Sequence, residues 1–63
     1  MSTVQLLILA EQLALDLGLE QKFKLIYQNY REHGMGVNAS IENTMIDLYQ
    51  WHRWNQVQRQ GSI

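Results

Sequence analysis

Apolar residues in the first half of the chain fall on two helical faces that meet near Gly18. At about 100° per residue, each face is formed by four residues: Leu6, Ala10, Leu13 and Leu17 before the glycine, and Leu19, Phe23, Ile26 and Tyr30 after it. The second face is offset from the first by well over a quarter turn, so one straight helix cannot direct both to a single core. Because glycine supplies the left-handed conformation that ends a helix, we expect helices over about 3–17 and 20–33 with a break at Gly18. A single helix that kinks there is the alternative.

Capping residues and glycines predict where the first and third helices begin. Ser2 followed by Gln5 matches the capping box, so the first helix is expected to begin at residue 3. Gly34 and Gly36 mark a loop, after which Asn38 or Ser40 is expected to cap a third helix over about 40–60. The expected inward face of that helix is formed by Ile41, Met45, Leu48, Tyr49 and His52. The predicted fold is all-α, with three short helices or, if Gly18 only kinks the chain, a helical hairpin.

The apolar surface of the first helix is too broad for a helix with one neighbour. Beside its main face it carries five further apolar residues: Val4, Leu7, Ile8, Ala14 and Leu15. A chain of 63 residues makes one small domain with a marginal core, and it has no cysteine for a disulfide or a thiolate metal site. We therefore expect a homo-oligomer, with a dimeric helical bundle favoured, whose core and dimer contacts come from Leu6, Leu9, Ala10, Leu13 and Leu17.

Composition narrows the function classes. The formal net charge is −1, which gives no general electrostatic attraction to nucleic acids or membrane surfaces. The apolar run from Leu6 to Ala10 is far shorter than the roughly twenty residues that cross a bilayer, and no basic segment precedes it as in a signal peptide. A cytoplasmic protein is the resulting expectation.

Two tryptophans lie off the inward face of the third helix. Trp51 and Trp54, together with Arg53 and Gln58, form a candidate protein-binding face, since Trp and Arg are enriched in binding hot spots. In the competing interpretations the tryptophans cover the broad first helix, or they stack on single-stranded bases. The favoured function is a small regulatory protein, an adaptor or inhibitor, that binds another protein.

The segment from Leu13 to Tyr27 partly resembles the helix-turn-helix of DNA-binding transcriptional regulators. Ala14 occupies the small position of that pattern, and Gly18 occupies the turn four residues later. The resemblance implies that Gln21, Lys22 and Lys24 contact DNA. The sequence departs from the pattern at Lys24, where a buried aliphatic residue is typical. A small DNA-binding regulator is therefore the alternative function.

No residue pattern indicates catalysis or a bound cofactor. The two histidines, His33 and His52, have no carboxylate at metal-ligand spacing, and a phosphate-binding glycine loop is absent. The sequence therefore predicts a non-enzymatic protein without a metal or cofactor.

Overall fold

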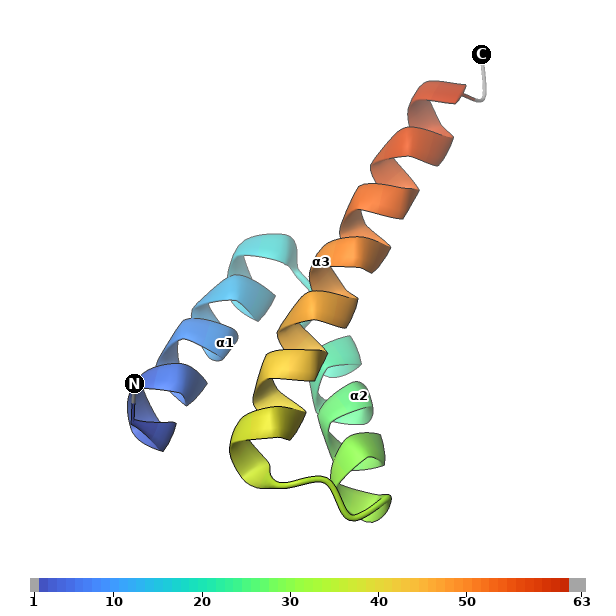
Figure 1. Ribbon diagram of the computed structural model, residues 1–63. Helices are drawn as coiled ribbons and strands as arrows, with labels where there is room; N and C mark the ends of the chain where they lie inside the picture. The colour runs from blue at the N-terminus through green and yellow to red at the C-terminus, as the bar shows by residue number, and fades with distance from the viewer. Residues whose placement is uncertain (1, 62–63) are drawn as a thin grey trace.

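Three helices form the described part of the chain, and local backbone chemistry sets their ends. The computed structural model describes the backbone of residues 2–61 and the side chains of residues 2–58. In it, α1 spans Thr3–Leu17, α2 spans Glu20–Glu32 and α3 spans Val37–Gly61 (Figure 1). No strand occurs within the described backbone. The prediction of an all-α protein with three helices is confirmed.

Both ends of α1 follow from the sequence. The Ser2 hydroxyl accepts a hydrogen bond from the Gln5 backbone N–H at 3.2 Å, and the Gln5 side chain accepts one from the Ser2 N–H at 3.0 Å, which completes the capping box. At the other end Gly18 is left-handed, with φ 68°. The Leu19 N–H then donates to the Ala14 carbonyl at 2.8 Å, as in a Schellman motif. Gly18 therefore breaks the helix, and the single kinked helix is excluded.

The start of α3 differs from the prediction. The helix begins at Val37 rather than near Ser40, because the Ser40 N–H already donates to the Gly36 carbonyl at 2.8 Å. Asn38 and Ser40 are not caps. The Asn38 side chain accepts a hydrogen bond from the Thr3 hydroxyl at 2.7 Å, and the buried Ser40 hydroxyl donates to the Met35 carbonyl at 3.3 Å. Their polar side chains connect α3 to its surroundings instead of starting it.

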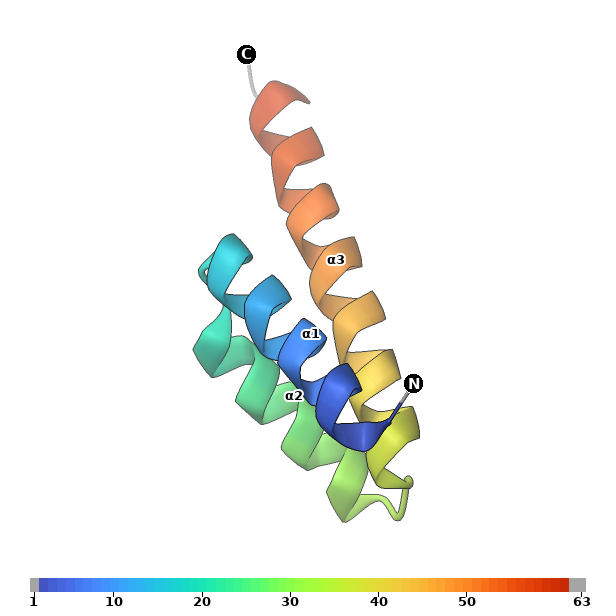
Figure 2. The same ribbon diagram turned by 90° about the vertical axis from the view of Figure 1, so that its left-hand side faces the viewer.

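α3 lies against both of the other helices, which touch each other only slightly. In Figure 1, α1 and α2 lie on either side of α3, and both views show them running in roughly opposite directions (Figures 1 and 2). At about 1.5 Å per residue, the 25 residues of α3 exceed the 15 of α1 by roughly 15 Å. The C-terminal end of α3 consequently projects beyond the turn between α1 and α2 (Figure 2).

The core lies where α3 meets the other two helices. Six apolar side chains are buried there: Leu6, Ala10, Ala14, Phe23, Ile41 and Leu48. Ser40 and Thr44 are fully buried as well, and the Thr44 hydroxyl donates to the Ser40 carbonyl at 2.6 Å. The predicted inward face of α3 is confirmed at Ile41 and Leu48 and is wrong at Tyr49, which is mostly exposed. The small residues Ser40 and Thr44 occupy the buried side of α3 instead. They let α3 approach its neighbours closely, and their hydroxyls donate to nearby carbonyls.

One polar contact ties α2 to α3. The Tyr30 hydroxyl donates a hydrogen bond to the Asp47 carboxylate. That hydrogen bond, together with partial desolvation and the negative charge of Asp47, raises the pKa of Tyr30 above 10.0. The hydrogen bond between Tyr30 and Asp47 therefore requires the Tyr30 side chain to be protonated.

We expect Tyr30 to lose its proton at a higher pH in the folded protein than in the unfolded chain. Because its pKa is raised in the folded protein, the stabilisation is fully present below pH 10.0 and is lost as the pH rises through the raised pKa. Absorbance of the phenolate measures the titration, and the difference between the wild type and Tyr30→Phe should titrate with a pKa above 10.0. A difference that titrates at or below pH 10.0 would contradict the assignment.

Candidate protein-binding surface

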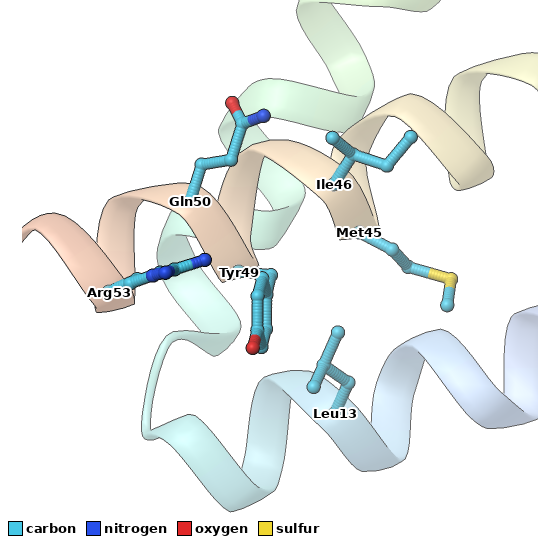
Figure 3. A pocket seen from close by; sticks show the side chains of 6 residues that line it. All are labelled: Leu13, Met45, Ile46, Tyr49, Gln50 and Arg53. Atoms are coloured by element: carbon cyan, nitrogen blue, oxygen red, sulfur yellow. The ribbon is translucent and has the colours of Figure 1, made fainter.

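An open hollow lies between α1 and α3. Its volume is about 430 Å³, and its lining consists of Leu13, Met45, Ile46, Tyr49, Gln50 and Arg53. Met45 and Tyr49 point toward Leu13 across the gap, whereas Ile46 and Gln50 lie on the side of α3 away from α1 (Figure 3). A second hollow of about 250 Å³ is lined by Gln50, Arg53, Trp54 and Val57. Gln50 and Arg53 line both, so the two hollows are neighbours along α3.

We call the six α3 residues that face solvent along these hollows the outer stripe of α3: Ile46, Tyr49, Gln50, Arg53, Trp54 and Val57. Leu48 is fully buried, so residues about half a turn from it project outward. Ile46 is 53% exposed, Tyr49 56%, Val57 57% and Trp54 61%. Together they expose on the order of 500 Å² of largely apolar side chain, at the upper end for the largest patch of a monomer. A patch of this size is typical of an interaction surface.

The structure separates the two tryptophans that the sequence grouped. Trp54 belongs to the outer stripe, and Arg53 lies beside it. Trp51 instead lies beside α2, where the Lys22 amine is 4.5 Å from the centre of its ring. It lines a different hollow, of about 330 Å³, with Leu17, Leu19, His52, Asn55 and Gln56. Gln58 is exposed one turn beyond Trp54.

Sequence reasoning missed four members of the outer stripe. Ile46, Gln50 and Val57 were not singled out, and Tyr49 was assigned to the inward face. The signal that could have found them is their spacing, because Ile46, Tyr49, Arg53 and Val57 recur every three or four residues. The buried face of α3 has the same period as the outer stripe. The two faces are distinguished only by which residues are buried, as Leu48 is.

The residues expected to form the core or a dimer contact divide into two groups. Leu6 and Ala10 are buried within one chain, while Leu13 and Leu17 are partly buried. Leu9 is 48% exposed. Three further apolar side chains of α1, at Val4, Ile8 and Leu15, are each at least 60% exposed. Intramolecular packing therefore covers only one side of this broadly apolar helix.

The residues that the helix-turn-helix resemblance assigns to DNA lie on different sides of α2. Gln21 and Lys24 are exposed, and Lys22 is partly buried against Trp51. Lys24 does not pack at the expected buried position. It lines a hollow of about 300 Å³ between α1 and α2, which also includes Glu11 and Glu20. Two carboxylates beside this lysine reduce the attraction of the hollow for phosphate.

Neither a metal-binding cluster nor a membrane-spanning helix occurs among the described residues. These residues contain no group of three His, Asp or Glu side chains placed to hold a metal ion. None of the three helices, over the same part of the chain, is both long and apolar enough to cross a bilayer. Comparison with known proteins gives no match to a protein-family model, a curated protein or a solved structure.

Proposed function

We propose that this protein is a non-enzymatic binding module, an adaptor or inhibitor, that binds another protein chain through the outer stripe of α3. One observation carries the proposal: four large apolar side chains, all more than half exposed, follow one side of a rigid helix around Arg53. Trp, Tyr and Arg dominate binding hot spots because they combine a large contact area with polar groups. The stripe contains one of each, at Trp54, Tyr49 and Arg53.

The spacing of the stripe supports recognition between helices. Ile46, Tyr49, Arg53 and Val57 repeat at the three- and four-residue intervals that place anchors on one side of a helix. The stripe also continues onto the projecting end of α3, which the α1–α2 pair does not cover (Figure 1). A partner can therefore approach along several turns without displacing part of the fold.

A photo-reactive residue introduced at Gln50 tests this proposal. Gln50 lies in the outer stripe, and Gln28 on α2 is a matched control because it is also an exposed glutamine. Each position is replaced in turn by a benzophenone-bearing amino acid, and the cells that make the protein are irradiated. We expect a discrete cross-linked species from position 50 and none from position 28. No adduct from position 50, or equal adducts from both positions, would contradict the proposal.

DNA binding through α2 is the second candidate function. The Gly18 turn between two helices favours it, and Gln21 and Lys24 are exposed in the first turns of α2. However, α1 and α2 run in opposite directions, whereas DNA-binding helix-turn-helix pairs meet at about 90–120° (Figure 2). The discriminating observation is affinity for mixed-sequence duplex DNA at low salt that falls as salt rises. Binding of that kind would favour this candidate over the outer stripe.

A further inference from the structure

We infer that the partner of the outer stripe is a second copy of this chain, with the two α3 helices packed antiparallel about a two-fold axis. The inference rests on the proposed function, because it names what covers the same surface. It follows from the positions of two charges, the length of α3 and the exposed area.

The charges at the two ends of the central part of the stripe are complementary. Glu42 and Arg53 are both exposed, and their eleven-residue separation places them on the same side of α3, about 16 Å apart along its axis. Ile46 and Tyr49 lie between them on that side. In an antiparallel pair centred between positions 47 and 48, Glu42 of each copy lies level with Arg53 of the other. Ile46 then meets Tyr49 at the centre, between two ion pairs.

A parallel pair has the opposite consequence. Its symmetry places each residue level with its own copy, so that Glu42 faces Glu42 and Arg53 faces Arg53. Like charges directly opposite each other at an interface are unfavourable and select against that arrangement. The charge pattern therefore specifies the direction of the helices as well as the face they use.

The length of α3 is consistent with the same two-fold axis. An axis between positions 47 and 48 aligns residues 37–58 of one copy with the same residues of the other, in reverse order. Val57 on the projecting end then lies level with Asn38, in the first turn of the other α3. The part of α3 that extends beyond its own α1 and α2 thus gains a neighbour in the second copy.

The exposed apolar area supplies more than half of what each partner of a standard interface buries. A standard interface buries about 800 Å² on each partner. The apolar members of the outer stripe offer on the order of 500 Å², estimated from their exposed fractions. Gln50, Arg53 and the partly buried Leu13 and Met45 lie at its edge and extend this area. A chain with so small a core also benefits from burying its exposed apolar surface.

A charge-swap cycle measured by sedimentation equilibrium of the full chain tests the inference. Arg53→Glu and Glu42→Arg each replace two ion pairs per dimer by two repulsive contacts, so each single variant should weaken dimerisation about tenfold or more at low salt. Glu42→Arg/Arg53→Glu together restore complementarity, and the dimer affinity should return to within about threefold of the wild type. Lys24→Glu and Glu32→Arg are the controls, since they make matched charge changes at exposed positions on α2. They should leave dimerisation unchanged, and circular dichroism checks that each variant is folded.

Three outcomes would overturn the inference. The first is a wild-type chain that stays monomeric from micromolar to millimolar concentration. The second is single swaps with no larger effect than the α2 controls, and the third is a double swap that does not regain affinity. The photo-cross-linking at position 50 distinguishes failure of the antiparallel dimer from failure of the proposed function. An adduct to a different protein from a monomeric chain would support the binding module and exclude the second copy. An adduct of twice the chain mass would support the outer stripe as a binding surface and the second copy as its partner.

Discussion

Leu48→Ala is expected to remove a large part of the protein's free energy of unfolding. Leu48 is fully buried in the cluster that α3 forms with α1 and α2. Truncation of a buried leucine to alanine costs about 2–5 kcal/mol, because transfer energy is lost and a cavity remains. A chain of 63 residues has a total stability of only about 3–9 kcal/mol, so this loss is a large part of the whole.

Urea unfolding followed by helical circular dichroism measures the effect. Leu25→Ala is the matched control, since it makes the same chemical change at a side chain that is 69% exposed on α2. Its free energy of unfolding should stay within about 0.5 kcal/mol of that of the wild type. All samples are compared at one protein concentration, because association would make the apparent stability depend on concentration. Similar losses in the two variants would contradict the position of the core.

Ala10→Leu is expected to destabilise the fold by about 1–3 kcal/mol, although it adds apolar surface. Ala10 of α1 is fully buried in the core cluster that also contains Ile41 and Leu48 of α3. Three additional heavy atoms would force the two helices apart or distort their side chains. Alanine and leucine have similar helix propensities, so the helix itself would not account for the loss.

Thermal or urea unfolding of Ala10→Leu should be compared with Ala39→Leu. Ala39 is exposed in the first turn of α3, so the same substitution there meets no buried neighbour. We expect the Ala39 variant to unfold close to the wild type. A stability equal to or above that of the wild type in Ala10→Leu would mean that the contact between α1 and α3 has room for a larger side chain.

The parts of the fold that local chemistry determines could be predicted from the sequence. The capping box of Ser2 and Gln5 involves neighbouring residues only, and the Gly18 break rests on the left-handed conformation that glycine adopts easily. Leu6 and Ala10 were placed correctly in the core by helical period alone. These signals do not depend on how the helices pack against one another.

The features that depend on tertiary contacts were missed. Ser40 has the residue type of a cap, but tertiary packing buries it and its hydroxyl bonds to Met35. Thr44 reads as polar, yet its hydroxyl is satisfied within α3, which allows it to be buried. α3 has apolar residues on two sides, and the period cannot tell which side faces α1 and α2. Tyr49 was therefore assigned to the wrong side.

The same limit applies to the candidate surface. Trp54 and Arg53 were recognised by residue type, but helical spacing alone did not reveal that Trp51 would lie over Lys22 on another part of the molecule. Ile46 and Val57 were overlooked because isolated exposed aliphatic residues are common in proteins. Their importance emerges only when burial of the opposite side shows that they are continuous with Tyr49.

The most direct test of the antiparallel α3 pair is disulfide formation between two single-cysteine chains. The protein contains no cysteine, so Glu42→Cys and Arg53→Cys each carry one thiol. The two chains are mixed in equal amounts, allowed to exchange, and oxidised, and the products are separated by mass. We expect the mixed dimer, linked from position 42 to position 53, to predominate, since it also keeps one intact Glu42–Arg53 pair at its other end. Products linked only from 42 to 42 and from 53 to 53, or no cross-link at all, would contradict the antiparallel pairing of the outer stripe.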